Sequence, residues 1–187
     1  KGGTQVFVYT RDQAGLFARM VAALDSKKVN IYDAQIMTNK DGFAMDTFVV
    51  LEQNGEAVTS PSRQQSIKKA LEQFIAGKPD LSRQKPRLSR QMRQFSVPPK
   101  VVFLPGNTKH RTMLEIAALD TPGLLCDLGQ VFQQCGVNIH AAKITTIGER
   151  AEDFFLISNA ADDALTPEQQ SELKRSLIAQ LSQQTEG

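Results

Sequence analysis

Two short sets of polar and small residues recur in this sequence at the same spacing, and each could bind a small charged molecule. Each set has an aspartate, a glycine three residues later and an asparagine fifteen residues after that glycine. Glycine leaves the backbone open to close approach, and the free N–H groups at a helix start attract a carboxylate. Asparagine offers both a donor and an acceptor, so the pattern predicts a site for a small zwitterion such as an amino acid. The six residues are Asp12, Gly15, Asn30, Asp120, Gly123 and Asn138.

Structural roles could also explain these residues. Asp120 could cap a helix, Gly123 could allow a helix to pack closely on a sheet, and Asn138 could fill a turn left by Gly136. Duplication preserves residues for reasons of fold as well as function. The recurrence therefore supports a binding hypothesis without deciding it.

Other residues that could do chemistry form no complete catalytic set. The two histidines, His110 and His140, have no nearby acid at metal-ligand spacing, and the sequence contains no HExxH, P-loop or GxSxG motif. Asp46 and Asp153 are single acids on expected strands, so we expect structural roles for them. Cys126 and Cys135 would point to opposite sides of one helix, which predicts ordinary thiols rather than a disulfide or a metal site. We expect no catalytic residue and no metal in this chain.

An internal duplication organises the elements that position these residues. Residues 12–38 align with residues 120–146 with nine identities in 27 positions, at an offset of 108 residues. That offset is much longer than the period of a solenoid, so the sequence predicts two related modules.

Each copy shows the same order of hydrophobic patterns. An extended apolar segment leads through the aspartate into a helix with one buried stripe, and two β-rich runs joined by a short turn follow. A second helix begins at Ser60-Pro61 and at Thr166-Pro167, where Gln169 could complete a capping box. The expected strands are 5–10, 29–38, 43–51, 100–104, 112–119, 137–147 and 150–158.

A fourth strand would complete each module as an α+β, ferredoxin-like βαββαβ sandwich with both helices on one face of an antiparallel sheet. We assign the 100–104 strand to a first domain spanning residues 4–104, which includes a basic linker at 77–96. The second domain spans residues 111–187 and lacks a strand after its last helix. Either it keeps three strands, or it shares the 100–104 strand.

Composition excludes several classes of protein. The 187 residues are 41% hydrophobic with a formal charge of +2, which permits real cores and does not by itself indicate a nucleic acid or membrane partner. No apolar run reaches the roughly 18 residues of a spanning helix, so we expect a cytoplasmic protein, cut from something longer. The basic linker lacks the aromatic residues of a single-strand binder and is interpreted as packing on another part of the protein; the alternative is a phosphate-binding arm.

Two stretches resemble ACT domains, the regulatory modules that bind amino acids. They are "DQAGLFARMVAALDSKKVNIYDAQIMTNKDGFAMDTFVV" and "DTPGLLCDLGQVFQQCGVNIHAAKITTIGERAEDFFLI". The span from Gln5 to Leu181, with "FSVPPKVVFLP" and "TTIGERAEDFFLI", resembles more closely the C-terminal tandem ACT region of bifunctional uridylyltransferase/uridylyl-removing enzymes that act on the PII nitrogen-signalling protein.

This resemblance implies a glutamine sensor without catalytic activity of its own. In such enzymes glutamine at the ACT modules shifts activity from adding UMP to PII toward removing it. The implied partners are L-glutamine, PII, the enzyme's own catalytic domains with their Mg²⁺, and a possible second copy through the ACT sheets. The alternative is an ACT module that mediates only interaction or dimerisation.

The resemblance also carries the ligand loops onto this sequence, with each loop paired to the asparagine of its own module. In the first module Ala14 replaces the usual proline and Lys28 stands where the second copy has Gly136, so we expect the second site to be the better formed. The implied ligand-binding residues are Asp12, Gln13, Ala14, Gly15, Leu16, Asn30 and Ile31 in the first module and Asp120, Thr121, Pro122, Gly123, Leu124, Leu125, Asn138 and Ile139 in the second.

Overall fold

The chain folds as two modules with the same order of elements. The structure is a computed structural model that describes residues 2–77, 97–106 and 109–186. The first module contains β1 (Thr4–Arg11), α1 (Leu16–Ser26), β2 (Asn30–Met37), β3 (Phe43–Leu51) and α2 (Pro61–Ile75). The second contains β4 (Lys100–Pro105), β5 (Thr112–Leu119), α3 (Leu124–Gln134), β6 (Asn138–Ile147), β7 (Arg150–Ser158) and α4 (Pro167–Glu186).

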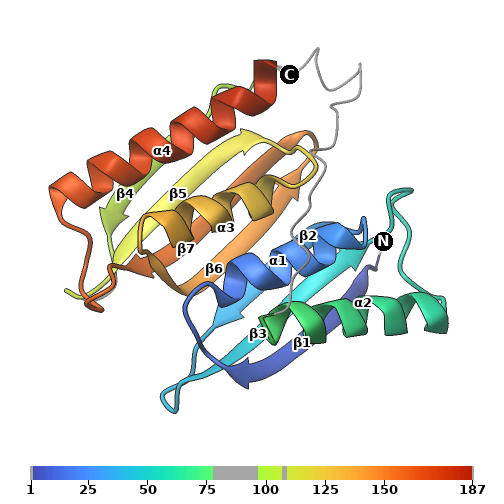
Figure 1. The fold of residues 1–187 in the computed structure, drawn as a ribbon. Coiled ribbons are helices and arrows are strands. Elements are labelled where there is room, and N and C mark those ends of the chain that lie inside the picture. The colour runs from blue at the N-terminus through green and yellow to red at the C-terminus, as the bar shows by residue number, and fades with distance from the viewer. Residues whose placement is uncertain (1, 78–96, 107–108, 187) are drawn as a thin grey trace.

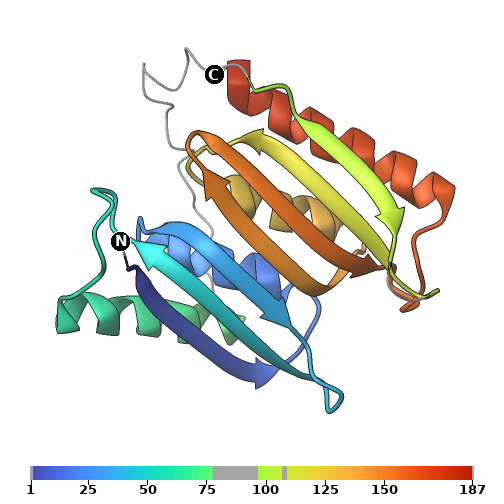
Figure 2. The same ribbon diagram turned by 180° about the vertical axis from the view of Figure 1, so that it is seen from behind.

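All seven of these strands form one antiparallel sheet. Their order is β1-β3-β2-β6-β7-β5-β4, so the central β2–β6 pair joins the two modules. The four described helices lie on one face of this sheet (Figure 1), and none of them covers the opposite face (Figure 2). The ferredoxin-like α+β fold expected from the sequence is confirmed, with the two sheets fused into one.

A single hydrophobic core runs beneath the helices and crosses the boundary between modules. The Phe155 ring of β7 lies 5.0 Å from the Phe132 ring of α3 and 6.1 Å from the Phe17 ring of α1, both in edge-to-face contact. Edge-to-face aromatic pairs add about 0.5–1.5 kcal/mol beyond their buried area. The modules are therefore joined by side-chain packing as well as by strand pairing.

Helices α1 and α3 approach closely at Gly129. A methyl group added at this glycine would lie 3.0 Å from the Cα atom and 3.1 Å from the Cβ atom of Ala18 on α1. Glycine costs helix stability in the middle of α3, so its use here is explained by this close packing of two backbones. The contact holds the N-terminal half of α1 against α3, beside the candidate site described below.

Most of the predicted local structure is confirmed. All the expected strands form, and the turns that join β2 to β3 and β6 to β7 are hairpins. The Thr166 N–H donates to Gln169 Oε1 at 3.0 Å, and the Gln169 N–H donates to Thr166 Oγ1 at 3.3 Å, so the capping box of α4 forms as predicted. Neither Cys126 nor Cys135 forms a disulfide in the described part of the chain.

The assignment of the 100–104 strand to the first domain was wrong. β4 pairs along its whole length with β5 of the second module, from Lys100 opposite Ala117 to Pro105 opposite Thr112. Six residues join β4 to β5, and such short connections favour antiparallel neighbours. The second module thus has four strands, and β1 borders only β3 among the described strands. The sequence predicted that the basic linker at 77–96 packs on another part of the protein. Residues 78–96 of this linker lie outside the described residues.

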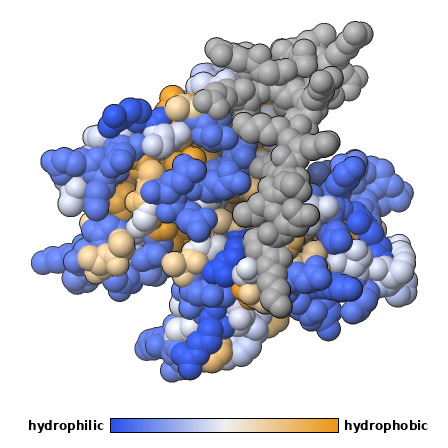
Figure 3. All heavy atoms as spheres, in the orientation of Figure 1, coloured by the Kyte–Doolittle hydropathy of each residue, from blue (hydrophilic) through white to orange (hydrophobic). Residues whose placement is uncertain are grey.

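The surface is divided between a polar helix side and a more apolar sheet side. Viewed from the helices, the outer surface is mostly hydrophilic (Figure 3). All of the exposed large hydrophobic side chains in the described residues lie on strands, namely Phe7, Tyr9, Tyr32, Met37, Leu104, Ile147 and Phe154. None of the described helices is long and apolar enough to cross a membrane.

Replacing Gly129 with valine tests the packing of α1 on α3. We expect Gly129→Val to lower the free energy of unfolding by about 1–3 kcal/mol, because the new side chain overlaps Ala18. Helix propensity alone would favour valine over glycine by a few tenths of a kcal/mol. Urea denaturation measures the change, and Gln134→Val on the exposed side of α3 is the control. Equal stability of the two variants would contradict the close approach.

Candidate ligand site between the modules

A cavity of about 290 Å³ opens between the two modules. The first module contributes the β1–α1 turn, the first turn of α1 and residues of β2 and β3. The second contributes the C-terminal part of α3 and the start of β6. The polar and small residues that line it are Asp12, Gln13, Ala14, Gly15, Thr38, Asp46, Gly129, Gln133, Asn138 and His140, with Leu16, Phe17, Ala18, Ile36, Ala44, Phe132, Val137 and Ile139 as the remaining wall.

Backbone and side-chain hydrogen bonds hold the β1–α1 turn in place. The Asp12 N–H donates to the Gly42 carbonyl at 2.9 Å, and the Leu16 N–H donates to the Gln13 carbonyl at 3.0 Å. The Thr38 hydroxyl donates to Asp12 Oδ2 at 2.8 Å. The Asp12 carboxylate is therefore fixed at the end of β2, while the start of α1 faces the cavity without a side-chain cap.

Gly15 has two local reasons to be glycine. Its φ of +73° lies in the left-handed region, which a residue with a Cβ adopts only with strain. A Cβ at this position would also lie 3.2 Å from Nε2 of Gln133, a residue of α3 in the other module. The sequence predicted that a group approaches the backbone closely at this glycine. The Gln133 side chain does so, and it also lines the cavity.

Two aspartates at equivalent positions of the hairpins are buried and hard to ionise. Burial raises the pKa of Asp46 to about 6, although the Met37 N–H donates to its Oδ1 at 3.1 Å. Burial raises the pKa of Asp153 to about 7. Asp153 Oδ2 has no hydrogen-bond partner among the described residues, and Asp46 lines the cavity together with Asp12. These acids were expected to be structural, and Asp46 also lines the cavity.

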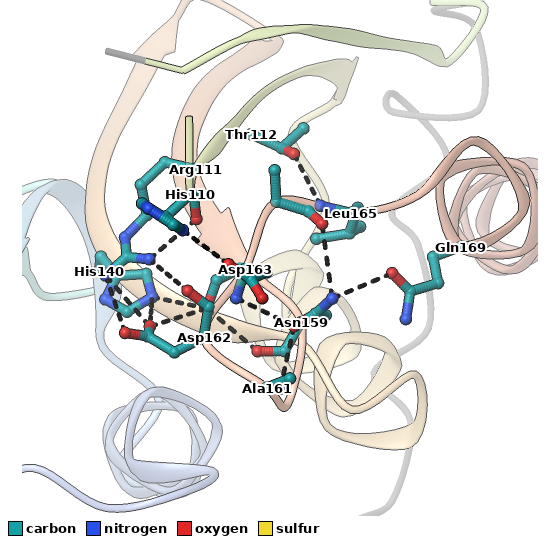
Figure 4. A network of polar contacts seen from close by, with 12 residues as sticks. His110, Arg111, Thr112, His140, Asn159, Ala161, Asp162, Asp163, Leu165 and Gln169 are labelled. Atoms are coloured by element: carbon teal, nitrogen blue, oxygen red, sulfur yellow. Dashed lines mark hydrogen bonds and ion pairs between the residues drawn. The ribbon is translucent and has the colours of Figure 1, made fainter. Parts of the chain in front are cut away.

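A polar network supports the far wall of the cavity (Figure 4). His140 Nε2 lies 2.8 Å from the Ser158 hydroxyl and 3.4 Å from Asp162 Oδ1. Arg111 donates to the Asp162 carbonyl at 2.9 Å, which fastens the loop after β7 to the segment before β5. Burial, followed by the charge of Arg111, lowers the pKa of His140. The imidazole is therefore neutral near pH 7, and a ring nitrogen can donate or accept a hydrogen bond at the site.

The structure changes which asparagine belongs to which loop. The sequence paired each loop with the asparagine of its own module, but Asn138 lines a cavity with Asp12 and not with Asp120. Within the second module the Asp120 loop and Asn138 lie at opposite ends of α3, whose 11 residues span about 16 Å at 1.5 Å per residue. The antiparallel β2–β6 pair instead brings the start of β6 to the end of β2. The Asn138 amide donates to the Asn159 carbonyl at 3.2 Å.

The second predicted loop has the same local geometry as the first. Gly123 begins α3 with a φ of +81°, and the Asp120 N–H donates to the Glu149 carbonyl at 2.9 Å. Burial raises the pKa of Asp120, which also accepts a hydrogen bond from Thr146. The antiparallel β2–β6 pair likewise brings the end of β6 to the start of β2. Binding at the second loop, which the sequence paired with Asn138 and Ile139, stays a prediction; its residues are Asp120, Thr121, Pro122, Gly123, Leu124 and Leu125.

Sequence reasoning missed several residues that line the cavity. Thr38 and its counterpart Thr146 were identical in the repeat, and this recurrence could have marked them as partners of the two aspartates. Gln133 and Gly129 gave no such signal, because their positions in the first module hold Asp25 and Val21. No cluster of metal-ligating side chains occurs within the described parts of the chain.

Comparison with known families identifies the fold of the second module directly. The model of the ACT domain matches residues 112–174. Residues 112–174 form an ACT domain. A solved aspartate kinase from Synechocystis superposes on this chain with a TM-score of 0.50 at 16% identity, over 91% of this chain and 25% of the kinase, which supports the same fold for the whole tandem ACT region.

Curated relatives match both ACT modules together. The chain is 45% identical over 183 residues to the bifunctional uridylyltransferase/uridylyl-removing enzyme of Vibrio cholerae and 48% identical over 183 residues to that of Vibrio campbellii. The matches cover 98% and 97% of this chain, but only 21% of each enzyme. The chain therefore belongs to this enzyme family and corresponds to about a fifth of the length of these relatives.

The buried acids of the ACT modules predict a specific dependence of stability on pH. Because the pKa of Asp153 rises from 3.8 to about 7 on folding, the folded state holds its proton more tightly than the unfolded state. Its contribution to stability is full below pH 4 and is lost as the pH rises through 7. The unsubstituted chain should lose free energy of unfolding between pH 5 and pH 8. In Asp153→Asn this loss should be smaller by about 1–3 kcal/mol.

Urea denaturation at several pH values measures this difference. Asp41→Asn, on an exposed turn, is the matched control and should keep the pH dependence of the unsubstituted chain. An unchanged slope for Asp153→Asn would contradict the assignment of the raised pKa to this residue.

Proposed function

We propose that the cavity between the ACT modules binds L-glutamine, and that this chain is the regulatory region of a cytoplasmic enzyme that adds uridylyl groups to the PII nitrogen-regulatory protein and removes them. The names of the relatives support the two activities of the parent enzyme, which lie in the rest of its length. The ACT match supports a regulatory module. The parent's catalytic domains would hold the Mg²⁺ used in its chemistry.

The charge of the cavity is the observation that carries this proposal. Two carboxyls, Asp12 and Asp46, line it, and no lysine or arginine does so among the described residues. Such a lining repels nucleotides and other phosphates but attracts an ammonium group. The volume of about 290 Å³ is at the lower end of the roughly 300–1,000 Å³ typical of small-molecule pockets, which suits a ligand as small as an amino acid.

Each group of a bound glutamine would have a partner in the cavity. The ligand ammonium would lie near Asp12 and Asp46. Its carboxylate would lie at the start of α1, where N–H groups lack intrahelical partners and the helix dipole favours negative charge. The side-chain amide needs a donor and an acceptor, and Asn138, Gln133 and the neutral His140 supply both.

The energies required of such a sensor are modest. A dissociation constant of about 0.1–1 mM, which suits an abundant metabolite, corresponds to roughly 4–5.5 kcal/mol. A coupling of about 1–3 kcal/mol to the catalytic domains is enough to shift the parent enzyme from uridylyl transfer to uridylyl removal. Because the cavity is built from both modules, binding can favour one arrangement of the modules over another.

Calorimetric titration with glutamine, glutamate and serine tests the ligand. We expect glutamine to bind most tightly, and Asn138→Ala to weaken it about 5- to 30-fold through the loss of a hydrogen bond to the ligand amide. Asn30→Ala is the matched control, since Asn30 lies at the equivalent place outside the cavity. If both sets bind, Asn30→Ala will instead weaken binding at half of the sites by a similar factor. No heat with several millimolar glutamine, in a chain that remains folded, would favour the alternative of a pure interaction module.

The pKa of Asp46 predicts how binding depends on pH. In the free cavity Asp46 is mostly protonated at pH 5 and mostly ionised at pH 7.5, because its pKa is about 6. The ligand ammonium favours the ionised form, so glutamine should bind about tenfold more tightly at pH 7.5 than at pH 5. Asp46→Asn should remove most of this dependence, while Asp153→Asn, in the other module, should keep it. Equal pH dependence in both variants would place the coupled proton elsewhere.

A further inference from the structure

Within the described parts of the chain, strand β1 has one edge without a partner strand. It pairs with β3 through all eight of its residues, and among the described residues no strand borders its other side. The side chains of Phe7 and Tyr9 on β1 are 62% and 58% exposed. An exposed edge with unpaired N–H and C=O groups and large aromatic side chains is a template for another strand.

The equivalent strand of the second module shows what occupies that edge. β5 lies between β7 and β4, and all of its residues are buried or half-buried. At the position of Phe7 the second module has Glu115, which accepts a hydrogen bond from Lys100 of β4 at 2.8 Å. Helix α4 also packs against β4. β4 therefore covers in the second module the edge that is open in the first.

The internal repeat indicates where the matching strand is encoded. β4 precedes β5 in the chain and reaches it through a six-residue connection. Shifting β4 and β5 by the 108-residue offset of the repeat carries β5 onto β1 and carries β4 onto the fourth to ninth residues before Lys1. The matched relatives are about five times as long as this chain, so their polypeptide extends well beyond the matched part.

We propose that, in the full-length protein, the residues just before Lys1 form a strand that folds back antiparallel on β1. The register of β4 on β5 places the fifth residue before Lys1 opposite Gln5 and the ninth opposite Tyr9. The repeat unit is then strand, strand, helix, strand, strand, helix, so each ACT module receives its edge strand from the preceding segment rather than from after its last helix. The new strand would extend the sheet of seven described strands by one.

The chemistry of the missing strand follows from its counterpart. Val101 of β4 is buried and lies opposite Ile116, whose place in the first module is taken by Val8. An apolar side chain opposite Val8 would close the core between β1 and α2. Side chains on the other face of the new strand would shield Phe7 and Tyr9 from water.

Disulfide trapping in the full-length protein tests the predicted register. Cysteine replaces Tyr9 and the ninth residue before Lys1, which would face each other with Cα atoms about 4.5–5.5 Å apart, within reach of a disulfide. Lys100→Cys with Ala117→Cys is the matched control, because this pair occupies the same position in the second module. We expect intrachain disulfides in both pairs after mild oxidation, at similar yields by peptide mass spectrometry. Moving the cysteine at position 9 by one residue should reduce the yield to less than a tenth.

Other outcomes would overturn the proposal. Formation of the control disulfide alone would mean that the upstream segment does not pair with β1. An intermolecular disulfide between two Tyr9→Cys chains would mean that a second copy occupies the edge. Hydrogen exchange of the unsubstituted protein provides an independent measurement: the β1 amides that do not bond to β3 should exchange at least tenfold more slowly in the full-length protein than in residues 1–187.

Discussion

The antiparallel pairing of β2 with β6 is the constraint on which the rest of the structure depends. Gln35 lies opposite Lys143, its own counterpart in the repeat, so the register is symmetric about this pair. A salt bridge from Lys143 to Asp33, with N–O distances of 2.6 Å, lies next to that centre. Because the strands run in opposite directions, the end of each meets the start of the other. The cavity and the α1–α3 contact both follow from this arrangement.

A site built from two modules responds to how the modules lie against each other. The β1–α1 turn carries Asp12, whereas Asn138 and His140 come from the other module. A ligand that contacts both sides stabilises only the arrangement that brings them together, and its differential affinity sets the size of the response. Two contacts from α3 cross the same boundary between the modules. Gln133 packs against Gly15, and Gly129 packs against Ala18. The proposed binding site and the inter-module packing therefore use neighbouring residues.

The two copies are alike in plan but differ in detail. Lys28 adopts a φ of +53° at the turn where the second copy has Gly136 at +65°, so the first module accepts strain that glycine avoids in the second. Both hairpins keep a buried aspartate, Asp46 and Asp153, although burial opposes its ionisation in each case. Asp46 has a cavity to face, while Asp153 has an oxygen without a described partner.

The sequence by itself determined the elements, because hydrophobic periodicity, the glycine turns and the Thr166–Gln169 capping box are local signals. The repeat also identified Asp12, Gly15 and Asn138 as unusual. Only the tertiary structure decided that Asn138 faces the Asp12 loop and that β4 belongs to β5. Strand pairing depends on contacts between segments, and the pattern along one segment does not specify its partner; the short connection between β4 and β5 favours their pairing without deciding it. For the same reason Gln133, unremarkable in the sequence, became part of the cavity only when α3 packed against α1.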